Sequence, residues 1–314
     1  MLETILLGSG GGMPTPYRNL SAMMINYMGR KILVDCGEGT QVSMKIVGRG
    51  FKTIDIICIT HIHGDHIIGL PGLLSTIGNS GKTNPLIIIG PVGIFEAVKS
   101  LMYIVGKMPY EIVILENPKN IDFNDKSFLE KLPKGFEPLN VYIKTLDLEH
   151  SMPCLGYNFE IKRNPKFSIE KAQKNNVPKK YWNRLQKGEE ILEDNVLYTK
   201  DMVLGEERKG IKISYITDTR PIESIVDFVF ESDLFICEGT YGSDEDLHKA
   251  IKNKHMTFRE AAKLSKKAKV KKLILTHFSP ALLEPEDYIE NAKEVFNESY
   301  LAYDRLIETL NFKN

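Results

Sequence analysis

Three histidines and one aspartate fall within six residues of this chain. His61, His63, Asp65 and His66 come directly after an apolar, strand-like run over residues 54–60. Neutral imidazole and carboxylate are the groups that Zn²⁺ takes as ligands, and a run ending this way cannot bury them without partners. Alternate residues His61 and His63 can point to one side, while Asp65 and His66 curl over at a helix start. A metal site is the favoured interpretation, and a polar turn with solvated histidines is the alternative.

Three further apolar runs end in side chains of the same kind. The runs over 142–149, 213–217 and 273–276 are followed by His150, Asp218 and His277. In α/β folds, ligands gather just beyond the carboxyl ends of strands, so four such runs predict one shared site. Alone, a histidine there is usually structural and an aspartate usually caps a helix, so the prediction depends on the recurrence.

The seven donors exceed what one metal ion needs. They suit two ions, with the carboxylate of Asp218 as the natural bridge between them. Two ions about 3.5–4 Å apart can hold a hydroxide and clamp the attacking and leaving oxygens of a displacement reaction. The pattern therefore predicts a hydrolase.

The elements that must position these donors alternate along the 314 residues. Strand-like and helical patterns follow each other, which indicates a mixed α/β fold. The expected strands include 22–27, 86–89 and 112–115, and the expected helices include 40–47, 94–105, 222–230, 257–268 and an acidic one over 286–296. The helix over 257–268 opens with a capping-box pattern, Thr257 to Glu260.

Composition excludes several classes of protein. With 42% hydrophobic and 26% charged residues, the chain is not mainly disordered, collagenous or coiled coil. The formal net charge of zero argues against a protein that is basic all over. The four cysteines are widely spaced and are expected to be buried thiols. We find no signal peptide and no membrane-length apolar run, so we expect no membrane association and a cytoplasmic location.

The zero net charge is a sum of opposed patches. Residues 162–187 hold nine Lys or Arg and one acid, with the single tryptophan, Trp182, among them. Residues 249–272 hold ten Lys or Arg, and acids gather near the C-terminus. A charge run is usually a solvated face, but Lys and Arg can also bind nucleic-acid phosphates, and aromatic residues can stack on bases or pack the segment on itself.

The motifs resemble those of a known family. His61-x-His63-x-Asp65-His66, with the later His150, Asp218 and His277, resembles the metallo-β-lactamase superfamily. The loop over 35–41, the run over 61–74 and the segment Asp218-Thr219-Arg220-Pro221 are similar, more closely, to the ribonuclease Z family of tRNA 3′-processing endoribonucleases. The resemblance spans nearly the whole chain. It implies an αββα sandwich, with two mixed sheets flanked by helices.

The resemblance also implies roles for individual residues. His61, His63 and His150 would hold one zinc ion, and Asp65, His66 and His277 the second, with Asp218 bridging both. Asp65 would also orient or deprotonate the nucleophile. His255 matches the position of the family's further catalytic histidine, and would assist the departing oxygen. Its alternative interpretation is an exposed histidine beside a helix cap.

The same resemblance implies a domain organisation and a substrate. Residues 1–161 and 212–314 would form the catalytic domain, and residues 162–211 a protruding basic arm that binds tRNA. The expected substrate is precursor tRNA, cut after the discriminator base, and the family is typically homodimeric. The expected substrate-binding residues lie in the loop over 14–19 and in the arm: Arg18, Asn19, Lys179, Lys180, Trp182 and Arg184.

Two alternatives stay open at this point. A phosphodiesterase of small diesters, or another small-substrate hydrolase on the same scaffold, would need no RNA arm. A non-catalytic RNA-binding protein could keep the metal only in order to fold, although the complete donor set disfavours it.

Overall fold

The computed structural model describes residues 2–163 and 165–312 of the chain. Among these, one compact unit comprises residues 2–161 and 211–311. A second unit comprises residues 162–210 together with Phe312. Each unit has its own buried apolar cluster, so we describe each by itself.

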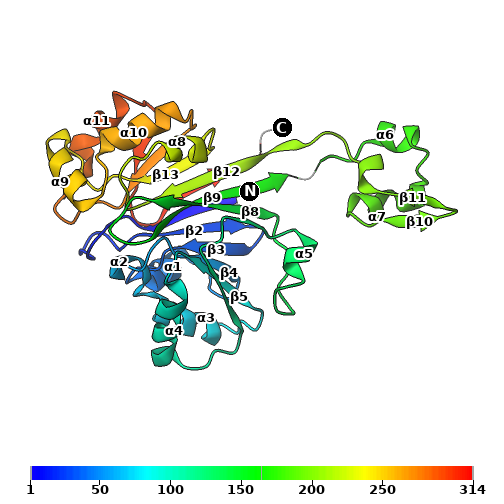
Figure 1. The fold of residues 1–314 in the computed structure, drawn as a ribbon, viewed down its shortest axis with the longest axis horizontal. Helices are drawn as coiled ribbons and strands as arrows, with labels where there is room; N and C mark the ends of the chain where they lie inside the picture. Colours follow the sequence, from blue (N-terminus) through cyan, green and yellow to red (C-terminus); the bar gives the residue numbers. More distant parts are fainter. Residues whose placement is uncertain (1, 164, 313–314) are drawn as a thin grey trace. The chain divides into compact units, whose positions relative to one another are not determined.

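The first unit is built on two seven-stranded sheets (Figure 1). The first sheet has the strand order β16-β1-β2-β3-β4-β5-β6. Its strands from β3 to β6 are parallel and its other pairs are antiparallel. Their bounds are β1 Leu2–Gly8, β2 Ala22–Tyr27, β3 Arg30–Val34, β4 Ile54–Cys58, β5 Leu86–Gly90, β6 Ile112–Glu116 and β16 Leu306–Leu310.

The second sheet has the order β15-β14-β13-β12-β9-β8-β7. The strands from β12 to β15 are parallel, whereas β7, β8 and β9 pair antiparallel. Their bounds are β7 Asn120–Asp122, β8 Val141–Leu148, β9 Cys154–Arg163, β12 Arg208–Ile216, β13 Leu234–Glu238, β14 Leu273–Thr276 and β15 Ser299–Leu301. The central strands β4, β5, β13 and β14 are buried along their whole length, which explains their continuous apolar sequences.

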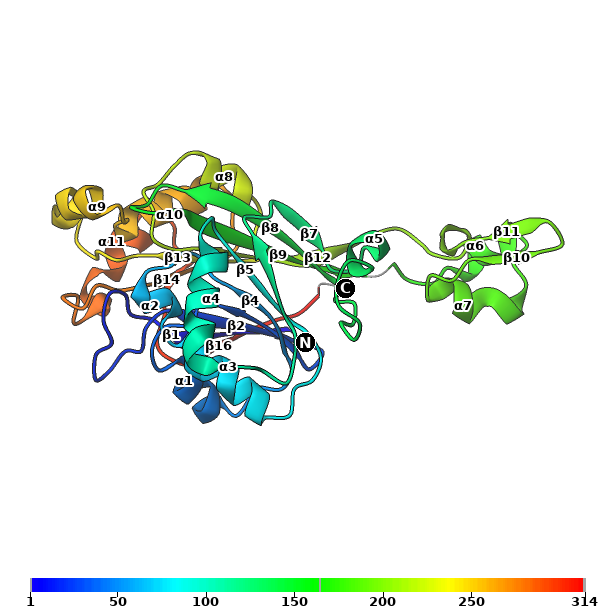
Figure 2. The same ribbon diagram turned by 60° about the horizontal axis from the view of Figure 1, so that its bottom comes forward.

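Helices cover the outer face of each sheet, as Figure 2 shows from a second direction. Helices α1 (Thr40–Val47), α3 (Leu70–Asn79) and α4 (Ile94–Val105) lie against the first sheet, with the short α2 (Gly64–Ile67) before α3. Helices α8 (Ser224–Val229) and α10 (Phe258–Lys267) lie against the second. The remaining helices of this unit are α5 Lys126–Leu129, α9 Leu247–Asn253 and α11 Ile289–Lys293, with 3-10 turns at Asp244–Asp246 and Pro285–Tyr288. The expected layering of helix, sheet, sheet and helix is confirmed.

The second unit is small and has a core of its own. It contains α6 (Ile169–Lys174), α7 (Trp182–Gln186) and a hairpin of β10 (Ile191–Glu193) and β11 (Val196–Tyr198), with 3-10 turns at Lys179–Tyr181 and Lys200–Met202. Its core residues are Ala172, Val177, Tyr181, Leu185, Ile191 and Val203, with Phe167 and Trp182 packed against them.

Most expected elements are confirmed, and one is confirmed only in part. Helices α1 and α4 have the predicted bounds, and the predicted capping box of α10 is present. The acidic helix over 286–296 is broken into a 3-10 turn and the five-residue α11, and several of the C-terminal acids lie outside it. Proline is tolerated at the first position of a helix, where Pro285 stands, and the strand β15 begins six residues after Lys293, the last residue of α11. Among the described residues, no helix is long and apolar enough to cross a membrane.

Candidate metal centre and active site

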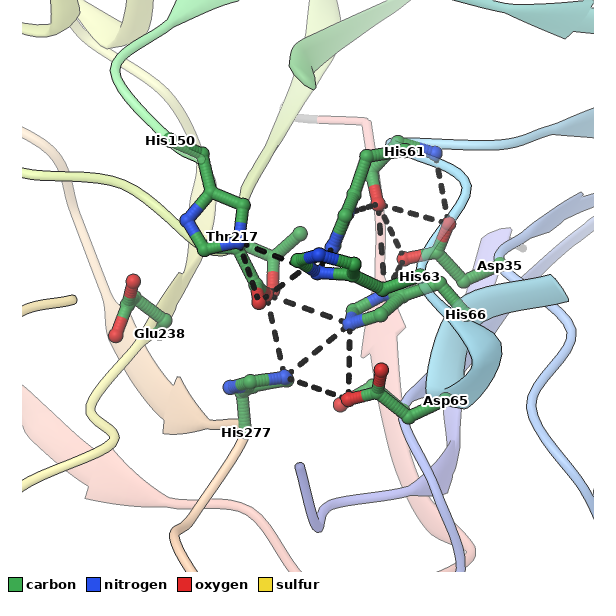
Figure 3. A network of polar contacts seen from close by, with 12 residues as sticks. Asp35, His61, His63, Asp65, His66, His150, Thr217, Glu238 and His277 are labelled. Carbon is green, nitrogen blue, oxygen red and sulfur yellow. Dashed lines mark hydrogen bonds and ion pairs between the residues drawn. The ribbon is translucent and has the colours of Figure 1, made fainter. Parts of the chain in front are cut away.

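Four strand ends deliver the predicted donors to one place. His61 and His63 follow β4, and α2 begins at Gly64, so Asp65 and His66 lie in its single turn. His150 follows β8, and Asp218 and His277 stand two and one residues beyond the ends of β12 and β14. Figure 3 shows the imidazoles converging from the two sheets.

The first cluster of donors contains three histidines and one carboxylate oxygen. His61 Nε2 lies 2.9 Å from His63 Nδ1, which in turn is 3.3 Å from His150 Nε2. Asp218 Oδ2 lies 3.6 Å from His61 Nε2 and 3.7 Å from His150 Nε2. All four ligand atoms lie within 4.8 Å of one another.

The second cluster shares the same aspartate through its other oxygen. Asp218 Oδ1 lies 3.4 Å from His66 Nε2 and 3.2 Å from His277 Nε2. Asp65 Oδ2 completes the group, 3.4 Å from His66 Nε2 and 3.5 Å from His277 Nε2. Asp218 therefore presents one oxygen to each cluster.

The spacing within both clusters fits a metal ion. With bonds of about 2.0–2.2 Å, the ligands of a tetrahedral ion stand about 3.3–3.6 Å apart, and the donor separations lie around that value. The clusters open on a cavity of about 420 Å³, lined among others by His63, Asp65, His150, Asp218, His255 and His277. The donor set is thus one that binds metal ions beside a space for substrate.

Burial and neighbouring charges shift the pKa values of Asp218 and His61. Burial raises the pKa of Asp218, but the histidines around it, His277 and His66 first, outweigh this and hold the pKa well below its usual value. Burial lowers the pKa of His61 well below its usual value, which keeps that imidazole neutral with a free lone pair. Both groups are therefore in the protonation state that metal binding requires.

Side chains behind the donors set their orientation. His66 Nδ1 donates to Asp35 Oδ2 at 2.8 Å, and His150 Nδ1 donates to the carbonyl of Lys254 at 3.3 Å. In each case the contact leaves Nε2 as the ligand nitrogen. Asp35 also accepts the backbone N–H of Thr60 at 2.8 Å. Sequence reasoning placed Asp35 in a family motif without assigning it this contact.

The glycine-rich loop after β1 approaches the centre closely. The backbone N–H of Gly12 donates to Asp65 Oδ2 at 2.7 Å. A Cβ on Gly11 would lie 2.4 Å from Cε1 of His277, so only glycine fits beside that ring.

His255 also lines the cavity, and it has a buried partner that sequence reasoning missed. Its Nδ1 donates to Glu238 Oε1 at 3.1 Å, and Glu238 is fully buried at the end of β13. Burial alone lowers the pKa of His255, but the charge and hydrogen bond of Glu238 raise it to about 9. The signal available in the sequence was a carboxylate ending the apolar run over 234–237, the pattern used for the other donors. His255 groups with Asp218 and His277 as a third possible ligand set, but its Nδ1 is engaged by Glu238.

The two loop residues expected to bind substrate have partners within the fold. The guanidinium of Arg18 donates to the carbonyls of Leu282 and Leu283. Asn19 donates from its side chain to Ser43 Oγ at 2.6 Å and from its backbone to Asp304 Oδ2 at 2.7 Å. These contacts hold the loop in place.

The four residues of the basic segment that are expected to bind substrate differ in their contacts and exposure. Lys180 pairs with Glu193 at 2.8 Å and Arg184 with Glu189 at 2.7 Å. Trp182 is half-buried, its ring lies tilted beside that of Phe167, and its indole N–H donates to the carbonyl of Val177 at 2.9 Å. Lys179 is exposed, with its Nζ 6.0 Å from the centre of the Trp182 ring. The tryptophan thus packs the unit on itself.

This chain is similar in sequence to several known proteins. A family profile described as "Anti-Pycsar protein Apyc1" matches residues 2–92. A ribonuclease Z of Clostridium beijerinckii is 64% identical over 313 residues, covering 99% of this chain and 99% of that protein. A ribonuclease Z of Clostridium perfringens is 57% identical over the full length of both chains.

Solved structures agree in fold over the whole chain. The short form of human tRNase Z has a TM-score of 0.68 and is 26% identical, covering 99% of this chain and 100% of that one. The metallo-β-lactamase fold protein YhfI of Bacillus subtilis has a TM-score of 0.66 at 18% identity and covers 98% of both chains. The metallo-β-lactamase sandwich is thereby confirmed, and at this level of full-length identity the chain belongs to the ribonuclease Z family.

Proposed function

We propose that this chain is a zinc-dependent endoribonuclease that removes the 3′ trailer from precursor tRNA. It cuts the phosphodiester after the discriminator base, leaving a 3′-hydroxyl on the tRNA and a 5′-phosphate on the trailer. The observation that carries the proposal is full-length identity of 64% to a ribonuclease Z together with two metal-ligand clusters at an open cavity. We propose a cytoplasmic location.

The donor chemistry supports two zinc ions per subunit. Imidazole nitrogens and carboxylate oxygens are zinc ligands, and each cluster leaves a side open to the cavity, as catalytic zinc sites do. His61, His63 and His150 would hold one ion, Asp65, His66 and His277 the other, and Asp218 both. When bound, zinc makes water acidic enough to serve as a nucleophile near neutral pH and neutralises charge on the phosphate.

The chain's own residues would then handle the protons. Asp65 uses Oδ2 toward the second cluster and the Gly12 N–H, which leaves Oδ1 to orient or deprotonate the attacking water. His255 would carry the proton for the departing ribose oxygen on Nε2, because Glu238 engages Nδ1 and favours the protonated ring. A positioned general acid is worth about 10² to 10⁴ in rate.

Residues 162–211 would be the arm that binds the body of the tRNA. The excess of Lys and Arg in residues 162–187 supports this role, because cations displace counterions from phosphates. We further propose a homodimer in which the arm of one subunit serves the active site of its partner.

The decisive experiment is cleavage of a precursor tRNA by the purified protein, with the cut mapped to the nucleotide. We expect a single cut after the discriminator base, loss of cutting with a chelator, and recovery on adding Zn²⁺. Metal analysis should find two zinc ions per chain. Cleavage at scattered positions, or cleavage that survives complete metal removal, would contradict the proposal.

A further inference from the structure

The loop that carries His255 is held at its backbone as well as at its ring. The carbonyl oxygen of His255 accepts a hydrogen bond from Nη1 of Arg220. The N–H of the next residue, Met256, donates to Glu238 Oε2 at 3.0 Å. Because a peptide unit is planar, these two bonds fix the peptide plane that follows His255. The N–H of His255 donates to the carbonyl of Ala250 at 2.8 Å, which holds the peptide that precedes it, and the two planes together set the direction of the His255 side chain.

Arg220 is itself held rigidly by an ion pair. Its Nη2 donates to Glu260 Oε1 and its Nη1 lies 3.1 Å from Glu260 Oε2, with 16% and 15% of the two side chains exposed. Glu260 Oε2 also accepts the backbone N–H of Thr257 at 3.0 Å, which completes the capping box of α10. The guanidinium therefore links His255 to the first turn of α10.

The backbone of Arg220 reaches the metal-ligand side of the site. Its N–H donates to the carbonyl of Glu149 at 3.1 Å, and the N–H of Glu149 donates to Thr219 Oγ1 at 3.0 Å. Glu149 directly precedes His150, and Thr219 directly follows Asp218. One residue thus connects the loops of two metal ligands with the loop of His255.

We propose that Arg220 is a positioning residue that aims His255 at the leaving oxygen of the RNA. The inference rests on the proposed role of His255 as the proton donor. Arg220 is not among the described residues that line the cavity, so it acts through His255 and not by touching substrate. The planar fork of Arg220 binds Glu260 through two nitrogens, which fixes the guanidinium in angle as well as in distance, and Nη1 then holds the carbonyl of His255.

Two substrates with different leaving groups can distinguish a positioning role of Arg220 from a merely structural one. A ribose oxygen departs slowly unless it receives a proton, whereas nitrophenolate is stable as an anion. Loss of aim at His255 therefore slows RNA cleavage and leaves hydrolysis of bis(4-nitrophenyl) phosphate nearly unchanged. Damage to the metal centre slows both reactions.

The first test compares Arg220→Met with a matched control, Arg259→Met. Arg259 also bonds two carboxylates, Asp244 at 2.6 Å and Glu294 at 2.8 Å, but not the His255 loop. We expect single-turnover cleavage of precursor tRNA to fall about 10- to 100-fold in Arg220→Met, part of the effect of a general acid. Turnover of bis(4-nitrophenyl) phosphate and zinc content should stay near wild type, and Arg259→Met should change neither reaction. Equal losses on both substrates at full zinc content would overturn the inference.

The second test is a double-mutant cycle with His255→Ala. If Arg220 acts through His255, adding Arg220→Met to His255→Ala causes no further loss on precursor tRNA. A further loss equal to that of Arg220→Met alone overturns the inference. If His255→Ala is slow but Arg220→Met is normal, only the inference fails. If His255→Ala cleaves at the wild-type rate, the proposed role of His255 fails as well.

Two milder variants cover the case in which Arg220→Met does not fold. Arg220→Lys keeps a cation but loses the fork, and Glu260→Gln keeps an oxygen for the Thr257 N–H while losing the charge. Both should reduce precursor tRNA cleavage selectively, with melting temperature and zinc content measured in parallel. Wild-type cleavage by both variants would overturn the inference.

Discussion

The Nδ1 nitrogen of His66 lies 2.8 Å from the Oδ2 oxygen of Asp35, and both side chains are fully buried. The carboxylate accepts on both sides, since its Oδ1 takes the N–H of Thr60 at 2.8 Å. The contact fixes the ring of His66 and leaves Nε2 for a metal ion. Removing a supporting contact of this kind typically lowers metal affinity by about 10- to 100-fold.

Asp35→Asn should therefore weaken zinc binding by about 10- to 100-fold. Asparagine has only one acceptor oxygen and cannot satisfy His66 and Thr60 together. Competition with a chromogenic chelator measures the affinity directly. Asp147→Asn is the matched control, because Asp147 is 69% exposed and pairs with Lys119 on the surface. Unchanged zinc affinity in Asp35→Asn would show that the buried carboxylate does not support the site.

Gly11→Ala should displace His277 and remove the second metal ion. The added Cβ would meet the ring at 2.4 Å, well inside van der Waals contact. We expect the zinc content to fall from two ions toward one and precursor tRNA cleavage to be lost. Gly64→Ala is the control: a Cβ there meets no atom within 4 Å, although Gly64 stands between His63 and Asp65. If Gly11→Ala kept full zinc occupancy, residue 11 would not lie as close to the ring of His277 as the structure shows.

Replacing residues 165–207 by a short turn should abolish precursor tRNA cleavage while hydrolysis of bis(4-nitrophenyl) phosphate continues. Strands β9 and β12 are neighbours in the second sheet, so they can be joined directly without breaking the first unit. The proposed metal ligands all lie outside the deleted segment. Equal loss of both activities would count against a substrate-binding role for this segment.

The same shortened chain tests the proposed dimer. Mixed with full-length His255→Ala, it should regain precursor tRNA cleavage, because one subunit then supplies an intact active site and the other an intact arm. Chromatographic mass measurement of the mixture checks that mixed dimers form. If they form and no cleavage returns, the arm does not serve the partner's site.

Lys179→Ala should weaken tRNA binding more than Lys180→Ala. The ammonium of Lys180 is already offset by Glu193 at 2.8 Å, whereas Lys179 is exposed over the Trp182 ring. Binding titrations at several salt concentrations should show the slope of log K against log salt falling by about one for Lys179→Ala. Trp182→Phe serves as the comparison, because this tryptophan packs the unit and its loss should lower thermal stability. If the two lysine variants weakened tRNA binding equally, the ion pair with Glu193 would not offset the charge of Lys180.

The chemistry of the donors could be predicted from the sequence because each donor directly follows an apolar run. His61, His63 and Asp65 are close in space partly because they are close in the chain. The capping box from Thr257 to Glu260 is likewise local, and the structure confirms it. The acidic C-terminal helix is only partly confirmed, as a 3-10 turn over Pro285–Tyr288 and the short α11 over Ile289–Lys293. The local pattern also did not predict β16, because this strand pairs with β1, about 300 positions away.

The sequence by itself determined the fold class, the residues proposed as metal ligands and the membership of a hydrolytic family. Tertiary structure alone decided which oxygen of Asp218 faces which cluster, that Glu238 is buried behind His255, and that Arg220 holds the backbone of His255. It also decided that Trp182 packs against Phe167 within its own unit. The physical reason is that the burial of a carboxylate, guanidinium or indole, and hence its hydrogen-bond partner, depends on how strands distant in sequence are stacked.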